Sequence, residues 1–299
     1  MRRSLRRREP EPRMIALTGA TGFVGRQILR ALMARDQPVR VIKRPGAELP
    51  DAPAATNGLE IATTADLFAE SDAGLDALTE GIDTLIHAAW YAEPGKYLNS
   101  ERNLDCLNGT LRLVQAFQRT GGRRFIGIGI GIGTCAEYDV QARILSTETP
   151  LRPGTLYAAA KASTFQLLSQ LLPAADIEFA WCRLFYLYGE GEDPRRLVPH
   201  LHASLSAGEP AELTSGRQIR DFLDVREAGE RIATVALGER QGPVNICSGV
   251  PITVRQLAEQ IADEYGRRDL LNFGARPDNR FDPPCVLGIA DGDLQHGSD

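Results

Sequence analysis

A glycine-rich turn near the amino terminus constrains the fold of this chain more than any other feature. The segment 14–18 is a short apolar run, which is typical of a buried parallel strand. From Val24 to Leu32 an apolar residue recurs every four positions, which predicts one face of a helix. Between the two segments stand three glycines at three-residue spacing, Gly19, Gly22 and Gly25. This order predicts the first strand, turn and helix of an α/β fold with a doubly wound parallel sheet.

Each glycine of the turn has a separate task in a site for a dinucleotide. Gly19 permits the tight turn, Gly22 lets backbone N–H groups approach a pyrophosphate, and Gly25 lets the helix pack closely on the strand. The amino end of the helix also favours an anion. A plain glycine-rich turn is the structural alternative. The residues expected to contact the cofactor here are Gly19, Thr21, Gly22, Phe23, Val24 and Gly25.

The end of the second expected strand indicates which dinucleotide binds. Residues 39–42 form this strand, and Lys43 and Arg44 follow it. A site that prefers NAD usually has Asp or Glu here to hold the ribose 2′-hydroxyl, whereas two basic residues suit a 2′-phosphate. We therefore expect NADPH, with NAD or NADH as the less favoured cofactor. A solvated basic loop is the alternative interpretation.

Two further segments are expected near the cofactor. Residues 84–90 read as the fourth strand, and the small residues at its end leave room for a ligand. His87 lies in this strand, and we interpret it as a hydrogen-bonded polar group at the strand end rather than as a catalytic one. The further cofactor contacts expected are Asp66, Leu67, Ala88 and Ala89.

A tyrosine and a lysine carry the catalytic prediction. Tyr157 and Lys161 stand four residues apart in an expected helix that runs to about residue 172, so they share one helix face. Lys161 can hold the cofactor ribose and lower the pKa of Tyr157 by placing a positive charge near the phenolate. Thr134 can hydrogen-bond the substrate oxygen. Together they predict a proton-transfer device beside a nicotinamide.

These motifs resemble those of the extended short-chain dehydrogenases/reductases, the NAD-dependent epimerase/dehydratase family that acts on nucleotide-sugars. The resemblance covers about residues 14–288 and rests on TGATGFVG, on the three catalytic candidates and on RLFYLYG at 183–189. The 4-keto-6-deoxyhexose reductases of the family resemble the chain most, through GTCAEYD, WCRLFYLYGEGED and GRQIRDFLDV. The resemblance implies a Rossmann-type sheet, a nicotinamide cofactor, a nucleotide-sugar substrate and a homodimer formed through helices at about 100–119 and 157–172.

The resemblance also implies contacts to the substrate. Arg220 would bind the diphosphate of the nucleotide-sugar and Arg276 would be a second phosphate contact, a task that suits the planar guanidinium. A surface salt bridge is the alternative for each arginine. Asn103 matches an asparagine often found on the helix behind the active site. The aromatic residues expected either to line the sugar pocket or to pack in the core are Trp90, Tyr186 and Tyr188.

Departures from the family pattern narrow the reaction. Members that dehydrate sugars carry an acidic pair directly after the catalytic Thr, where this chain has Cys135 and Ala136. Members that epimerise beside a ketone and then reduce it use a Cys/His pair. Cys135 stands one position too early for that role, and no histidine lies between His87 and His200. We therefore expect one hydride and one proton to be transferred at a carbonyl or carbinol.

An Ile-Gly repeat precedes the catalytic Thr. Residues 126–133 repeat Ile-Gly four times, so the strand reaches Thr134 later than the family pattern has it. An insertion of two dipeptides preserves the in/out alternation of a strand, but it displaces one end by roughly 13 Å if it is extended. The surplus must bulge out or the strand must slide, and a bulge near Thr134 would alter the placement of the catalytic set.

The chain is expected to form two interleaved lobes between irregular ends. Residues 14–184 form the dinucleotide-binding domain, and residues 185–299 mainly form a smaller C-terminal substrate-binding lobe over the carboxyl ends of the strands. The segment from Cys285 onward is expected to lack regular structure. Residues 1–13 are expected to be a disordered arginine-rich extension. The further elements expected are helices at 100–119, 195–207, 225–237 and 253–265, the last capped by Thr253 with Gln256, and a strand at 244–247.

Composition excludes several other classes of function. The 299-residue chain has a net charge of −5 and no run of about 18 apolar residues, which argues against nucleic-acid binding and a membrane span. Its five cysteines are scattered without a C-x-x-C pair, so we expect no disulfide framework, no metal site and a reducing, cytoplasmic location.

The leading prediction is NADPH-dependent reduction of the C4 ketone of a nucleotide-activated 4-keto-6-deoxyhexose, a step of deoxysugar biosynthesis. In this reaction Tyr157 donates the proton to the C4 oxygen, Thr134 hydrogen-bonds that oxygen, and Lys161 tunes Tyr157. A nucleotide-sugar 4-epimerase with tightly bound NAD is the alternative. A dinucleotide-binding regulator without catalysis is a third possibility.

Overall fold

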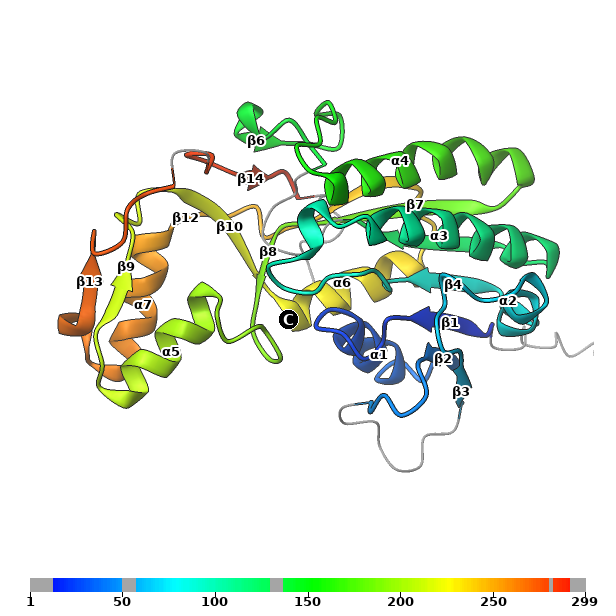
Figure 1. The fold of residues 1–299 in the computed structure, drawn as a ribbon, viewed down its shortest axis with the longest axis horizontal. Helices are drawn as coiled ribbons and strands as arrows, with labels where there is room; N and C mark the ends of the chain where they lie inside the picture. The colour runs from blue at the N-terminus through cyan, green and yellow to red at the C-terminus, as the bar shows by residue number, and fades with distance from the viewer. Residues whose placement is uncertain (1–12, 50–57, 130–136, 280–281, 291–299) are drawn as a thin grey trace, which may run out of the picture.

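A parallel sheet forms the centre of the molecule, as Figure 1 shows for the computed structural model, which describes residues 13–49, 58–129, 137–279 and 282–290. Seven strands lie in the order β11-β7-β5-β4-β1-β2-β3, and every neighbouring pair is parallel. The strands are β1 (Ile15–Thr18), β2 (Val39–Lys43), β3 (Leu59–Thr63), β4 (Thr84–His87), β5 (Arg124–Ile128), β7 (Glu178–Leu184) and β11 (Gly242–Ile246). The order reverses at β1, so the sheet is doubly wound, and the predicted Rossmann-type fold is confirmed.

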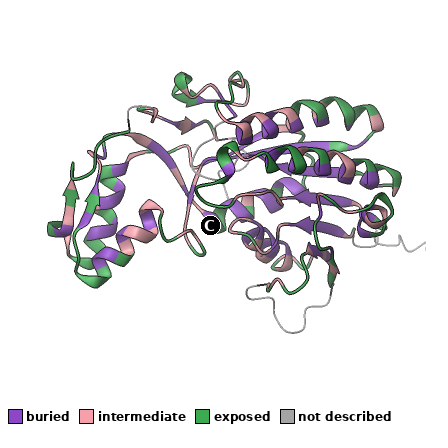
Figure 2. Cartoon of the chain, viewed as in Figure 1, coloured by how far each residue is buried: buried purple, intermediate pink, exposed green. Residues whose placement is uncertain are grey.

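Helices cover both faces of this sheet. Within β1, Ile15 and Leu17 belong to one apolar core and Ala16 to the other, because successive side chains of a strand point to opposite faces. Helices α1 (Gly25–Met33) and α6 (Val225–Leu237) pack together over the first core. The helices over the second core are α2 (Asp72–Thr79), α3 (Arg102–Arg119) and α4 (Leu156–Leu171). Figure 2 shows β1 and β4, between the two layers, as buried, whereas β3 at the edge of the sheet is largely exposed.

A smaller lobe stands to the left of the sheet in Figure 1 and has its own apolar core. Its helices α5 (Leu197–Ala207) and α7 (Val254–Tyr265) pack on a two-stranded sheet of β9 (Ala211–Leu213) and β13 (Leu271–Phe273). The expected cap of α7 is present as a reciprocal capping box between Thr253 and Gln256. The three-stranded sheet that joins this lobe to the rest contains β8 (Tyr186–Tyr188), β10 (Ile219–Asp224) and β12 (Pro251–Thr253).

The chain passes back and forth between the two parts. After β10 it returns to the large sheet through α6 and β11, and then leaves again through β12 and α7. The segment after Cys285 contains a short strand, β14 (Leu287–Gly288), which pairs with β6 (Ile144–Leu145), so the expectation that it lacks regular structure was wrong there. The carboxylate of the buried Asp221 accepts the backbone N–H of Gly288 at 3.1 Å and so holds β14 against β10.

Most of the element boundaries expected from the sequence lie within two residues of the observed ones. The helix expected from residue 100 begins at Arg102, and the one expected from 195 begins at Leu197. Strand β3 had not been predicted. The 3₁₀ turns are Tyr97–Asn99, Val140–Ala142, Pro173–Ala175 and Arg268–Leu270. In the part of the chain that the structure describes, no helix combines the length and apolarity needed to cross a membrane.

Candidate active site

The glycine turn between β1 and α1 leaves no room for side chains at two of its three glycines. Gly19 has a φ of +74°, and a Cβ there would lie 2.7 Å from the carbonyl carbon of Ala88. A Cβ on Gly25 would lie 2.0 Å from the carbonyl oxygen of Gly19. A Cβ on Gly22 would lie 3.3 Å from the carbonyl oxygen of Gly19, and the Gly22 N–H donates to that carbonyl at 3.0 Å. The turn is therefore closed by backbone contacts, as predicted.

The amino end of α1 fits a pyrophosphate. Its N-cap residue, Val24, makes no capping hydrogen bond with its side chain, and the first turn contains no acidic residue. The amino end of α1 thus has no side-chain cap and presents the positive end of the helix dipole. Arg26 adds a charge that the sequence reasoning missed: its guanidinium donates to the carbonyls of Thr21 at 3.4 Å and Gly22 at 3.3 Å. Phe23 is partly buried against the core of the α1 face.

The residues expected around the adenine and its ribose lie at the ends of β2 and β3. Lys43 turns back on its own loop and donates to the Ala47 carbonyl at 2.7 Å, whereas Arg44 is exposed. The Asp66 carboxylate accepts the Phe68 N–H at 3.0 Å, and Leu67 is buried in the core. Of this group, Arg44 is the basic side chain that extends into solvent.

Tyr157 and Lys161 meet on one face at the start of α4, where Thr155 caps the helix. The tyrosine is 4% exposed and the lysine 3%. The Lys161 ammonium donates to the Ile128 carbonyl of β5 at 2.7 Å and lies 4.0 Å from the ring centroid of Trp90. The Tyr157 ring packs edge-on against Tyr97. The structure therefore brings the predicted pair together at the carboxyl ends of the central strands.

The electrostatics of Lys161 are unusual. Burial lowers its pKa to about 8, while the carboxylate of Glu137 opposes this decrease. A protonated Lys161 one helical turn from Tyr157 stabilises a phenolate there. The lysine is therefore close to its titration point near neutral pH, which is typical of a group that takes part in proton transfer.

Thr134, the third catalytic candidate, lies outside the described residues, as does the second half of the Ile-Gly repeat, residues 130–133. The described residues on both sides of that gap are anchored to β7. The Gly129 N–H donates to the Cys182 carbonyl at 2.7 Å. Glu137 is 1% exposed, and its carboxylate accepts the indole N–H of Trp181 at 3.1 Å and the Arg183 guanidinium at 3.3 Å. Glu137 is not among the site residues predicted from the sequence.

Asn103 has a positioning role. Its side-chain oxygen accepts the indole N–H of Trp90 at 2.9 Å, and its side-chain nitrogen donates to the carbonyls of Tyr97 at 2.6 Å and Ser100 at 2.8 Å. The rings of Trp90 and Tyr97 both pack edge-on against the Tyr157 ring. Asn103 therefore fixes the indole that covers Lys161.

His87 is a hydrogen-bonded polar group at the end of β4. Its two ring nitrogens lie 2.9 Å from the hydroxyls of Thr18 and Thr110. Burial lowers its pKa to about 3, so the ring is neutral. Thr18 also accepts the Ala89 N–H at 3.2 Å, which ties the turn after β4 to the glycine turn.

Two of the residues expected to bind substrate, Arg220 and Tyr186, lie on the small sheet that joins the lobes. Arg220 is 2% exposed, lies 5.3 Å from the ring centroid of Tyr186 and pairs with Asp282 at 2.6 Å. Its other terminal nitrogen donates to the Ile219 carbonyl. Arg276 is exposed on the loop after β13. The structure thus places Arg220 within protein contacts and Arg276 at the surface.

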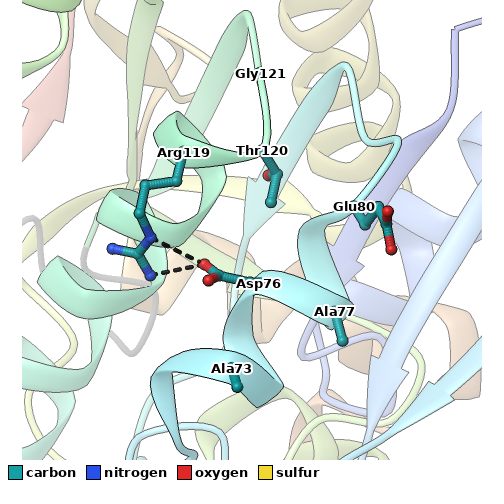
Figure 3. A pocket seen from close by; sticks show the side chains of 7 residues that line it. All are labelled: Ala73, Asp76, Ala77, Glu80, Arg119, Thr120 and Gly121. Carbon is teal, nitrogen blue, oxygen red and sulfur yellow. Dashed lines mark hydrogen bonds and ion pairs between the residues drawn. The ribbon is translucent and has the colours of Figure 1, made fainter.

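A surface hollow of about 580 Å³ lies elsewhere, between α2 and the end of α3 (Figure 3). Asp76 and Arg119 face each other across it as an ion pair. Gly121 lies in its wall just before β5 begins, so the hollow opens at the amino ends of the strands, opposite the residues described above. Among the described residues, no cluster of three or more His, Cys, Asp or Glu side chains could hold a metal ion.

Several known proteins with similar sequences are named as enzymes of nucleotide-sugars. The dTDP-6-deoxy-L-talose 4-dehydrogenase (NAD(+)) of Aggregatibacter actinomycetemcomitans is 24% identical over 92% of this chain and 98% of its own. The corresponding NAD(P)(+) enzyme of Kitasatospora kifunensis is 27% identical over 85% and 80%.

Solved structures confirm the fold. A UDP-N-acetylglucosamine 4-epimerase of Methanobrevibacter ruminantium superposes with a TM-score of 0.80 at 21% identity, covering 96% of this chain and 92% of its own. The UDP-glucose 4-epimerase of Thermus thermophilus, solved with NAD, gives 0.77 at 20% identity, covering 94% and 91%. The model of the NAD dependent epimerase/dehydratase family matches residues 15–247. This chain therefore belongs to the NAD dependent epimerase/dehydratase family, the extended short-chain dehydrogenases/reductases.

Proposed function

We propose that this protein reduces the C4 ketone of a nucleotide-activated 4-keto-6-deoxyhexose with NADPH. The observation that carries the proposal is the buried Tyr157–Lys161 pair beneath Trp90, at the carboxyl ends of β4 and β5. The relatives named as dTDP-6-deoxy-L-talose 4-dehydrogenases support C4 of a deoxysugar as the reacting carbon. A relative named dTDP-4-dehydro-6-deoxy-D-allose reductase, 22% identical over 92% of this chain, supports the direction of reduction.

Tyr157, Thr134 and Lys161 would each have a separate role in one proton transfer. Tyr157 gives its phenolic proton to the C4 oxygen as that oxygen gains charge, and Thr134 donates a hydrogen bond to the same oxygen. The Lys161 ammonium, held on the Ile128 carbonyl, stabilises the phenolate that remains. A bound NADPH would supply the hydride to C4, so that one hydride and one proton convert the ketone to an alcohol.

The cofactor would lie from the glycine turn to α4. Gly22 would let backbone N–H groups approach the pyrophosphate, while Gly25 packs on Gly19, which borders Ala88 and Ala89. We assign the preference for NADPH to the basic end of β2, with Arg44 as the residue free to reach a 2′-phosphate. The other adenosine contacts proposed are Lys43, Asp66 and Leu67.

The substrate would lie between the Tyr157 region and the joining sheet. Trp90 and Tyr186 would border the sugar, and Arg220 and Arg276 would bind the diphosphate. For Arg220 this requires that it exchange its bond to Asp282 for one to the phosphate, since the carboxylate now holds it at 2.6 Å. A guanidinium can make that exchange without loss of charge pairing.

The test is the oxidation of NADPH by the purified protein in the presence of dTDP-4-keto-6-deoxyglucose, with NADH in a parallel assay. Rapid consumption of NADPH, slower consumption of NADH and a product reduced at C4 support the proposal. Interconversion of a nucleotide-sugar without consumption of added cofactor, by protein that retains its nicotinamide, would instead identify a 4-epimerase. Binding of NADPH without turnover of dTDP-, CDP- or GDP-linked sugars would identify a regulator.

We also propose a cytoplasmic homodimer joined through α3 and α4. Leu104 on α3 is 46% exposed, and Leu167 and Leu171 on α4 are 49% and 36% exposed. Leucines exposed on neighbouring helices favour burial against a second copy. The scattered cysteines, without a C-x-x-C pair, support a reducing compartment. Light scattering should give twice the monomer mass, and Leu167→Glu should return the protein to a monomer.

A further inference from the structure

A buried carboxylate lies directly behind the catalytic lysine. Lys161 donates to the carbonyl of Ile128, and Gly129 is the next residue of the same chain segment. A Cβ built on Gly129 would lie 2.7 Å from a carboxylate oxygen of Glu137. The backbone at the end of β5 therefore touches the ammonium at one residue and the carboxylate at the next.

The indole of Trp181 links the same two groups. Its N–H donates to the Glu137 oxygens at 3.1 and 3.3 Å, and its ring centroid lies 5.8 Å from the Lys161 nitrogen. Trp181 is 1% exposed, so little water separates the charges and their attraction is weakly screened. A residue larger than glycine at position 129 would separate them.

The other ionisable groups around Lys161 cannot replace this carboxylate. Burial raises the pKa of the Cys106 thiol on α3 and lowers that of His87 on β4 to about 3, so both are neutral near pH 7. Tyr157 shares the face of α4 and is the group that Lys161 serves. Arg183, which pairs with Glu137, also packs 4.6 Å from the ring of Phe165, one turn beyond Lys161 on α4.

We propose that Glu137 is a positioning residue whose carboxylate keeps the Lys161 ammonium charged and directed toward the end of β5. Its effect on the reaction is indirect and rests on the proposed function: it maintains the cation that stabilises the Tyr157 phenolate. The carboxylate opposes the loss of the proton that burial of Lys161 promotes. Arg183 limits this effect, because it shares the same carboxylate.

The composition of the chain permits a direct test that needs no substrate. Lys43, Lys96 and Lys161 are the only lysines, so protein grown with lysine labelled with ¹³C at the ε carbon gives three signals to titrate. Lys161→Arg identifies the third signal. In the wild-type protein we expect Lys161 to titrate near its pKa of about 8. In Glu137→Gln, which keeps the shape and removes the charge, we expect its pKa to fall by about one unit.

Two further variants separate charge from packing. Glu137→Asp keeps the charge on a shorter side chain, so the Lys161 titration should stay within about half a unit of wild type even if the protein is less stable. Glu148→Gln removes an exposed carboxylate in the following loop and should leave the titration unchanged. An unchanged Lys161 pKa in folded Glu137→Gln, or equal falls in all three variants, would overturn the proposal.

Glu137→Gln leaves a buried Arg183 without its partner, which can prevent folding. Arg183→Gln then provides the test with the opposite sign. It removes a nearby cation and leaves the carboxylate to Lys161, so the pKa of Lys161 should rise. A fall, or no change, contradicts the proposal. Each titration uses the protein without substrate. Its result therefore tests the role of Glu137 even if the reductase assay fails.

In the enzyme with cofactor and sugar, Glu137→Gln should also shift the pH profile of kcat on its alkaline side. Lys161 acts while protonated, so activity is lost as the pH rises through its pKa. A lower pKa in Glu137→Gln moves that loss to lower pH by the same interval, with KM nearly unchanged. A fall in kcat at every pH without a shift of the profile would assign Glu137 a structural role only.

Discussion

The two ends of the candidate site are built on different principles. The pyrophosphate end is made by consecutive residues, 19–25, and its geometry comes from the absence of side chains. The catalytic end gathers Lys161, Trp181 and Glu137 from separate parts of the chain, and every one of them is buried. The first end can be disturbed by a single added carbon. At the second end, a change of charge can shift the pKa of Lys161 without altering the shape of the site.

The largest effect is expected at the catalytic end. Tyr157→Phe keeps the ring that packs on Tyr97 and removes the phenolic proton that we propose is given to the substrate. We expect kcat to fall about 10³-fold, while NADPH affinity changes little. Steady-state kinetics and a fluorescence titration of NADPH measure the two quantities. Turnover at the wild-type rate would remove Tyr157 from the mechanism.

At the glycine turn we expect the reverse pattern, loss of binding before loss of chemistry. A Cβ in Gly25→Ala meets the Gly19 carbonyl oxygen at 2.0 Å, so the turn must shift. Such overpacking costs about 1–3 kcal/mol, which corresponds to weaker cofactor binding by up to about 100-fold. Gly154→Ala, where nothing lies within 4 Å of the new carbon, is the matched control. Equal cofactor affinity in both variants would contradict the role of the turn.

The pH dependence should report the charge of the catalytic end. Because burial lowers the pKa of Lys161 to about 8, the active protonated form predominates below that pH. We expect kcat to fall about tenfold per unit as the pH rises well above 8. His87, with a pKa of about 3, should add no limb between pH 5 and 8. A profile that stays flat to pH 10 would show that Lys161 is not titrated in the working enzyme.

The smallest effect concerns the cofactor preference. Arg44 is exposed, so its pairing with a 2′-phosphate is screened by solvent. Arg44→Ala should raise KM for NADPH by about fivefold, in line with roughly 1 kcal/mol for an exposed pair, and leave KM for NADH unchanged. The effect should diminish as salt is added. Equal changes for both cofactors would assign the preference to other residues.

Much of the site could be recognised from residues close together in sequence. The glycine spacing, the Tyr157–Lys161 interval and the Thr253 cap each depend on neighbours within one or two turns of backbone, so pattern alone predicts them. Strand β3 (Leu59–Thr63) was missed because it forms the edge of the sheet and has largely exposed side chains, which removes the apolar signal. Strand β14 was missed because a strand of two residues is too short to show an alternating pattern.

Tertiary structure decided what the buried polar groups do. Arg220 was expected to face a phosphate, and the fold pairs it with Asp282, 62 positions further along the chain. No sequence pattern predicted a role for Glu137. Its role depends on its contacts with Trp181 and Arg183 of β7 and on the space left by the absent side chain of Gly129. Local sequence determines backbone geometry through sterics and hydrogen bonds between neighbours. The charge state of a buried group depends instead on every dipole and charge that folding brings within a few ångströms of it.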